Sequence, residues 1–148
     1  MVLKHAVAFA FGLAFLTACA EPSATNAPAA ATIPPETVVT APAADVPANY
    51  AAFSGTWGGT WGTSLDGKLA VMEVAANGSV EAIYAWGDSP GDFEAGHRRR
   101  DGVIEGDTLT LETFGNGAVA SYVLANGVLE GKYDRGGNVT RGTFRRIE

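Results

Sequence analysis

The sequence predicts an all-β domain: an antiparallel up-and-down meander of about eight short strands that forms a small closed or nearly closed barrel. After residue 49 no segment shows helical periodicity, and short β-rich runs alternate with turn signals. Asn-Gly and Asp-Gly pairs supply the positive-φ residues of tight hairpins. They occur at 66–67, 77–78, 101–102, 116–117 and 126–127, with a further turn at 136–138 and a longer loop at 87–92. Connections this short favour antiparallel neighbours, and closure of the sheet removes its exposed edges.

The runs between these turns define the expected strands. They cover residues 55–61, 68–75, 80–86, 96–100, 103–113, 118–124, 129–134 and 140–147, the fifth with a potential break at Gly106. The first strand alternates clearly, since Phe53, Trp57 and Trp61 share one face. We take this aromatic face as the inward one.

The second strand fits the alternation badly. Its segment "LAVMEV" is apolar on both faces, so two registers stay open for Glu73. If Leu69 and Val71 face inward, Glu73 enters the barrel and needs a partner such as Arg99 or Arg146, because a buried carboxylate is costly. If the opposite face is inward, Glu73 faces water.

The basic run at residues 97–100 has no apolar face at all. Along a strand, Arg98 and Arg100 face one way while His97 and Arg99 face the other, so one pair can turn inward. Two interpretations stay open. The run is either an anion site, for phosphate, a lipid headgroup or lipopolysaccharide, or a set of outward cations that discourages pairing between sheet edges.

The N-terminal third of the chain differs in composition from the rest. Residues 1–18 combine a basic start at Lys4 with an apolar run, which is typical of a signal peptide and too short for a permanent membrane span. Residues 19–48 are rich in Ala and Pro and predict a disordered tether. Residues 49–148 then form the barrel domain.

The segment Leu16-Thr17-Ala18-Cys19 resembles the lipobox of bacterial lipoproteins. The resemblance implies diacylglycerol on the Cys19 thiol, cleavage of the leader before Cys19 and acylation of the new N-terminus. Acyl chains of this kind hold a soluble domain firmly on a lipid bilayer. Ala20, in place of Asp, implies the outer membrane of the cell envelope, with the domain in the periplasm or at the cell surface.

The first and last strands carry a second resemblance. Gly55 and Trp57 form a Gly-x-Trp at the start of the domain, and Arg145 and Arg146 lie near its end. A Gly-x-Trp with an Arg from the last strand over the Trp resembles the calycin barrels, which include lipocalins, fatty-acid-binding proteins and avidins. Arg146 shares parity with Phe144 and is the better candidate to cover Trp57. The resemblance implies the barrel and no particular ligand, because the strands are shorter than those of lipocalins and no terminal helix is visible.

Nothing in the domain selects a catalytic or metal-binding constellation. His97 is its one histidine, Cys19 is the only cysteine of the chain, and no Gly-x-Ser-x-Gly motif occurs. We therefore expect a protein that is not an enzyme and has no metal or cofactor. The net charge of −6 argues against general nucleic-acid binding, which needs a basic surface.

Aromatic residues are the candidate wall of a ligand site. An eight-stranded barrel is just wide enough to be filled by side chains or to hold one small ligand. Trp61, Tyr84 and Trp86 are the candidate ligand-binding rings, and Glu73 and Arg99 are the candidate polar members of the site. The alternative is that the same rings form a filled core.

We therefore expect a membrane-anchored envelope lipoprotein whose barrel binds a small apolar or amphiphilic molecule. Two alternatives stay open. One is a structural or interaction lipoprotein with a filled barrel that docks another envelope protein. The other is a carbohydrate-binding module that stacks a glycan on exposed Trp.

Overall fold

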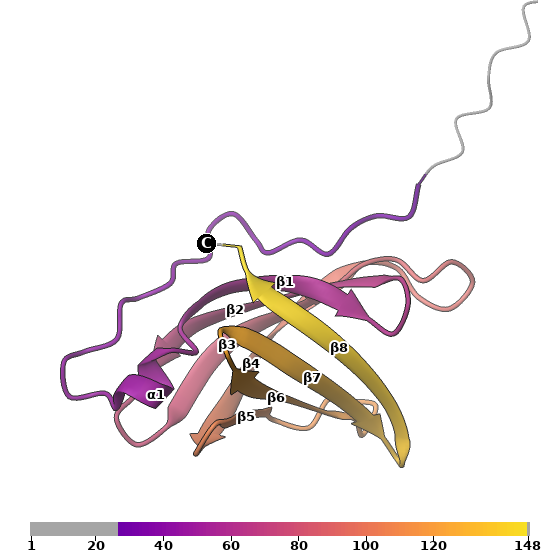
Figure 1. Ribbon diagram of the computed structural model, residues 1–148. Coiled ribbons are helices and arrows are strands. Elements are labelled where there is room, and N and C mark those ends of the chain that lie inside the picture. The colour runs from indigo at the N-terminus through magenta and orange to yellow at the C-terminus, as the bar shows by residue number, and fades with distance from the viewer. Residues whose placement is uncertain (1–26, 148) are drawn as a thin grey trace, which may run out of the picture.

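The computed structural model describes residues 27–147, in which eight antiparallel strands close into a barrel (Figure 1). The strands are β1 (Gly55–Trp61), β2 (Leu65–Val74), β3 (Ser79–Trp86), β4 (Gly96–Glu105), β5 (Thr108–Leu111), β6 (Val119–Ala125), β7 (Val128–Arg135) and β8 (Asn138–Arg146), and a short helix, α1 (Ala48–Ala51), precedes them. Each strand pairs with its sequence neighbour, and β8 pairs with β1. The predicted all-β up-and-down meander is confirmed, and the barrel is fully closed. The predicted signal peptide and Cys19 lie outside the described residues.

Most of the predicted turns reverse the chain where expected. Gly78 and Gly117 have φ angles of +88° and +81°, and the pair Asn126 and Gly127 has φ angles of +52° and +74°. These left-handed conformations are the ones that tight hairpin turns require. The Gly-Gly turn before β8 has the same character, with φ of +60° at Gly136.

Two predicted turns are wrong, because both dipeptides lie inside strands. Asp66 and Gly67 belong to β2, and the chain reverses earlier, at Gly62, whose φ is +58°. Asp101 and Gly102 belong to β4, which continues to Glu105, and the reversal comes at Gly106, with φ of +63°. Gly67 is needed within the strand because the Trp61 ring covers it, and an added Cβ would lie 2.9 Å from that ring.

Neither of the two predicted registers of β2 holds along the whole strand, because the residues that face inward change parity at a bulge. Leu69 and Val71 belong to the inner core, as does Val74. A β-bulge between Val71 and Glu73 inserts one residue, so the inward phase shifts by one. Glu73 is therefore exposed on the outer wall, although it shares sequence parity with Leu69.

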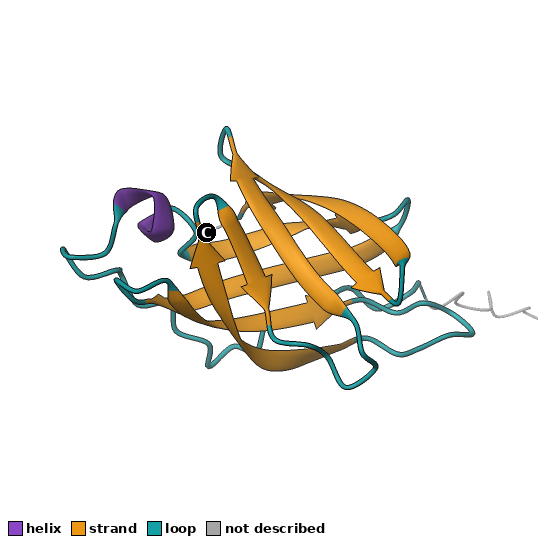
Figure 2. Cartoon of the chain, turned by 90° about the horizontal axis from the view of Figure 1, so that it is seen from below, coloured by secondary structure: helices purple, strands orange, loops and turns teal. Residues whose placement is uncertain are grey.

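The two ends of the barrel differ. The short helix α1 lies at one end of the barrel (Figure 2), which we call the α1 end. Side chains that are completely or almost completely buried fill this end. They include Phe53, Trp57, Leu69, Ile104, Leu109, Leu111, Tyr122, Leu129 and Phe144. The opposite end, which we call the open end, is formed by the end of β1, the β3–β4 loop and the β5–β6 loop. All eight strands and the core between them lie within residues 27–147, so the barrel is complete in this part of the chain.

Residues 27–47, which the composition predicts to be a disordered tether, instead lie along the barrel from the open end to α1 (Figure 1). The amide of Ala31 donates to Asp66 Oδ2 at 2.7 Å, and Ala31 is fully buried. The amide of Thr40 donates to Met72 O at 2.8 Å. Because Met72 sits at the bulge and lacks a partner on β3, this bond satisfies a carbonyl that the sheet leaves free.

An apolar patch on the outer wall explains why β2 is apolar on both faces. Ala70, Met72 and Ile83 form a small buried cluster outside the barrel, and Ile33 of the N-terminal segment packs on it. A segment poor in large apolar groups thus docks through one Ile and several backbone hydrogen bonds. No helix among residues 27–147 is long and apolar enough to cross a membrane.

Candidate ligand-binding cavity

The open end of the barrel holds a cavity of about 580 Å³. Six aromatic side chains line it, namely Trp61, Tyr84, Trp86, Phe93, Phe114 and Tyr133. They come from β1, β3, β7 and the loops around them, so closure of the barrel brings together rings that are far apart in the sequence. Three of these rings, Trp61, Tyr84 and Trp86, are the ones that the sequence predicted as a ligand wall.

The rings are packed against one another. The centroid of Tyr84 lies 4.9 Å from that of Phe114 in an edge-to-face contact and 6.4 Å from that of Tyr133 in a stacked one. Trp86 lies 5.9 Å from Tyr84. Trp86 Nε1 donates to Glu94 O at 2.9 Å, which fixes the indole at the rim. Such contacts hold the wall in one geometry before any ligand arrives.

Trp61 forms the floor of the cavity. It is only 3 % exposed, and its ring lies 4.9 Å from Phe144 and 5.8 Å from Tyr122 on the side of the filled core. Gly131 and Gly142 make room for it, since an added Cβ at either would come within 2.9 Å of the indole. The barrel is thus filled between Trp61 and the α1 end, and the cavity lies between Trp61 and the open end.

Two arginines of β4 face into the barrel. Arg98 pairs with Tyr84 and Arg100 with Ala82, both of which face inward, so the two guanidinium groups share the inner face. Arg98 Cζ lies 5.9 Å from the Trp86 ring centroid, and Arg100 Cζ lies 4.7 Å from that of Phe114. Both residues line the cavity.

Arg99 was predicted as a member of the site and lies elsewhere. It faces the outer wall, where it forms an ion pair with Glu81. This hydrogen bond holds the pKa of the Glu81 carboxyl below its ordinary value. Arg99 faces outward because it alternates with the inward Arg98 and Arg100, so the sequence prediction chose the wrong parity.

Glu73 was the other predicted polar member, and it is also outside the barrel. The bulge in β2 turns its carboxylate to solvent, away from Trp61 and Tyr84. The expectation that Glu73 enters the barrel beside Arg99 or Arg146 is therefore wrong.

Two buried polar atoms of the cavity lack partners within residues 27–147. Trp61 Nε1 and Arg100 Nε are buried without a hydrogen bond to any described residue. Tyr133 is satisfied, because its hydroxyl oxygen accepts a 2.8 Å bond from Asn116 Nδ2. Burial, helped by the neighbouring Tyr133, raises the pKa of the Tyr84 phenol well above its ordinary value, so this hydroxyl stays neutral at physiological pH.

The signature residues lie at the α1 end, away from the cavity. Arg146 Cζ lies 4.3 Å from the Trp57 ring centroid, as the calycin resemblance implies. Arg146 Nη2 donates to Ala52 O at 2.8 Å, so it also ties β8 to the turn before β1. Gly55 has a φ of +125°, a conformation that residues with a Cβ rarely adopt. These three residues lie at the α1 end of the barrel, and the cavity lies at the opposite end.

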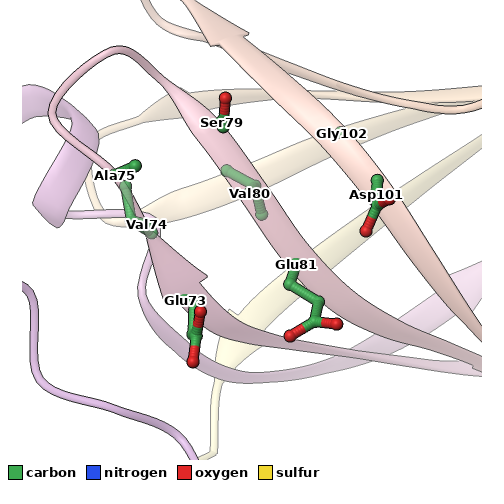
Figure 3. A pocket seen from close by; sticks show the side chains of 8 residues that line it. All are labelled: Glu73, Val74, Ala75, Ser79, Val80, Glu81, Asp101 and Gly102. Carbon is green, nitrogen blue, oxygen red and sulfur yellow. The ribbon is translucent and has the colours of Figure 1, made fainter.

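A second depression, of about 410 Å³, lies on the outer wall near the β2–β3 hairpin. Its carboxylates Glu73, Glu81 and Asp101 come from three neighbouring strands (Figure 3). One of them is already paired with Arg99, and among residues 27–147 no group of His, Cys, Asp and Glu is arranged to hold a metal ion. This surface is acidic, and no aromatic side chain of the described residues lines it.

The sequence missed several residues of the cavity. Phe93, Phe114 and Arg135 lie at strand ends or in loops, where alternation gives no facing. Tyr133 was detectable, because it shares its face of β7 with the buried Leu129, four residues earlier. No protein-family model and no curated protein matches the chain. The closed eight-stranded antiparallel barrel is compatible with a calycin-like fold.

Proposed function

We propose that this protein is an envelope lipoprotein whose barrel binds a small apolar or amphiphilic molecule at its open end. The observation that supports binding is the cavity of about 580 Å³ lined by aromatic rings, in a barrel whose other half is filled. This volume lies within the range of about 300 to 1,000 Å³ typical of small-molecule sites. The proposal includes no catalytic role, since the one histidine of the domain, His97, is exposed on the outer wall.

The two alternatives lose part of their support. A glycan-stacking surface needs exposed tryptophans, but Trp57 and Trp61 are 1 % and 3 % exposed. Trp86, at the rim, is itself half-buried. An interaction lipoprotein was expected to have a filled barrel, whereas only the half beyond Trp61 is filled. Docking of another envelope protein remains an outcome that the following test can favour.

Blocking the cavity tests the proposed binding. Gly115 lines the cavity, and an added Cβ there meets no atom within 4 Å, so Gly115→Trp places an indole in the open space without a backbone clash. With residues 20–148, we expect the neutral fluorophore N-phenyl-1-naphthylamine to bind with enhanced emission. We expect Gly115→Trp to weaken this binding about tenfold or more, which is 1.4 kcal/mol or more.

Val139→Trp is the matched control for this substitution. Val139 is exposed on β8 and alternates with the cavity residue Thr140, so its new indole lies on the outer wall. Binding of the probe should not change. If the wild-type domain binds no apolar probe, or if both variants bind it as tightly as the wild type, the cavity is not a binding site, and the interaction role becomes the better proposal.

The membrane anchor is a separate part of the proposal. Its support is the lipobox-like segment that ends at Cys19. Cys19→Ala should give a soluble or unprocessed protein, whereas Ser23→Ala, four residues further on, should fractionate with the outer membrane like the wild type. Normal membrane fractionation of Cys19→Ala would contradict the anchor.

A further inference from the structure

The charged side chains that line the cavity are all cationic. They are Arg98, Arg100 and Arg135, and no Asp or Glu lines it. The chain as a whole is acidic, with 16 Asp and Glu against 10 Lys and Arg. Three cations at one end of an acidic barrel are therefore a local concentration of positive charge, and not a reflection of composition.

These arginines have no carboxylate partner in the described part of the chain. The ion pairs there join Arg99 to Glu81 and Lys132 to Asp134, both on the outer wall. Arg98 donates only to the carbonyl of the adjacent His97, at 3.0 Å. Arg100 Nε is buried without any partner. Arg100 is half-buried and Arg98 is exposed at the open end, and neither has a counter-charge among the described residues, so both groups are suited to receive an anion from outside.

The guanidinium groups of Arg98 and Arg100 lie over aromatic rings of the cavity. Arg98 lies over Trp86 and Arg100 over Phe114, so the guanidinium groups are positioned by contact with the rings before a ligand arrives. A guanidinium group that lies over a ring can still donate hydrogen bonds from its N–H groups to a carboxylate, sulfonate or phosphate. An anionic group at Arg98 and Arg100 would leave the rest of its molecule against Tyr84, Phe114 and Tyr133.

The floor of the cavity limits the length of the ligand. Trp61 packs on Phe144 and Tyr122, and the barrel beyond is filled, so a long acyl chain has no channel to follow toward α1. A compact body with flat faces fits the ring-lined space better. Planar bodies also gain offset and edge-to-face contacts with such rings.

We propose that the ligand is a compact organic anion, a flat apolar or aromatic body that carries one acidic group held by Arg98 and Arg100, with Arg135 at the rim. This inference rests on the proposed function, because it assigns the chemical class of the molecule bound in the same cavity. It requires an acidic group on the ligand, which the proposed function alone does not.

A pair of probes that differ in one acidic group tests this inference. The sulfonate 8-anilinonaphthalene-1-sulfonate and the neutral N-phenyl-1-naphthylamine share the same ring body. For residues 20–148 we expect the sulfonate to bind about tenfold more tightly or better, as for a hydrogen bond between charged groups. Gly115→Trp should weaken both probes, which places both in the cavity.

Neighbouring arginines on β4 provide matched variants. Arg98→Gln and Arg100→Gln should each weaken the sulfonate about tenfold and the neutral probe by a clearly smaller factor. Arg99→Gln, on the outer wall, should change neither affinity. Raising the salt concentration on the wild-type domain should weaken only the sulfonate, and this measurement needs no substitution.

The outcomes separate the two proposals. If neither probe binds in the cavity, the proposed function fails and this inference fails with it. If both bind equally, and neither Arg98→Gln, Arg100→Gln nor salt distinguishes them, the cavity is a binding site for neutral apolar molecules and only the anionic assignment is wrong. A selective loss in Arg99→Gln would also overturn it, because the anion would then be held on the outer wall.

Discussion

Trp61 divides the barrel into its filled half and its cavity. Its ring lies between Phe144, with centroids 4.9 Å apart, and Tyr84, with centroids 6.3 Å apart. Inward glycines surround it, and an added Cβ at Gly67 or Gly131 would come within 2.9 Å of the indole. A larger residue at these positions must displace the floor of the cavity. Single inward glycines on β2, β7 and β8, namely Gly67, Gly131 and Gly142, thus let a tryptophan lie across so small a barrel.

Tyr122 carries a buried hydroxyl without a partner among the described residues. Burial raises the pKa of this phenol well above its ordinary value, so it remains neutral. Tyr122→Phe keeps the ring contacts with Trp61 and Phe144 and removes only the unsatisfied oxygen. We expect the free energy of unfolding, measured by urea denaturation, to stay the same or rise by about 1 kcal/mol.

Tyr133→Phe is the comparison for this change. It removes the hydroxyl that accepts a bond from Asn116, so we expect the free energy of unfolding to fall by about 0.5 to 1.5 kcal/mol. A fall of more than about 1 kcal/mol for Tyr122→Phe would instead mean that its hydroxyl has a partner in solution.

Sequence alternation predicted some site residues correctly and others not. Trp61, Tyr84 and Trp86 line the cavity because their strands are regular where they lie, so a period of two holds. Glu73 follows a bulge, which reverses the phase within one strand. A bulge leaves no mark in the residue pattern, so the position of Glu73 could not be predicted from parity alone.

The facing of the arginines depended on the length of strand β4. Asp101-Gly102 is a typical hairpin dipeptide, so the sequence prediction placed a turn there. That turn put Arg98 and Arg100 on one predicted strand and Ile104 on the next, so the facing of Ile104 could not be carried over to the arginines. In the structure β4 runs straight through to Glu105, so the buried Ile104 shares its face with both arginines. Had the strand been continued to Gly106, the inward facing of Arg98 and Arg100 would have followed from that of Ile104.

The pairing of β1 with β8 closes the barrel and depends on one of two adjacent glycines. Gly59 faces inward opposite Phe144, and a Cβ there would overlap the backbone carbonyl of Thr143 and lie 2.8 Å from Phe144 Cα. Because backbone cannot move aside without breaking the ladder, Gly59→Ala should lower the free energy of unfolding by about 3 kcal/mol or more, measured by chemical denaturation.

Gly58→Ala is the internal control for that pairing. Its added Cβ points outward and meets only the side chain of Ile147, at 3.2 Å, and Ile147 is exposed and free to move. We expect a change within about 0.5 kcal/mol. Similar losses at both positions would show that backbone entropy, and not the close approach of the two strands, is the reason for the glycines.

Considered as a whole, the molecule is a barrel with an ordered N-terminal segment along its wall. Strand number and antiparallel order were predictable, because turn dipeptides and alternation are local signals. The prediction left closed and nearly closed barrels open, because closure depends on the distant pairing of β1 with β8. The docking of residues 27–47 was not, since it depends on hydrogen bonds to Asp66, Met72 and Asp88, which a composition rich in Ala and Pro does not reveal. The outward apolar Met72 and Ile83 were the visible sign that something covers this wall.

Asp88 joins the N-terminal segment to the open end of the barrel and makes this attachment sensitive to pH. Its carboxylate accepts hydrogen bonds from the amides of Ala29 and Ala95, which lower its pKa below the ordinary value of 3.8. Since the pKa is lower when the segment is docked, the stabilisation is fully present above pH 3.8. It is lost as the pH falls through the lowered pKa.

The amide proton shifts of Ala29 and Ala95, followed by NMR, should therefore titrate with a midpoint below pH 3.8. Asp88→Asn should remove this titration, whereas Asp92→Asn in the same loop should keep it, because Asp92 accepts only from the Ser89 hydroxyl. A midpoint at or above pH 3.8, or a titration that survives Asp88→Asn, would mean that another group holds the segment in place.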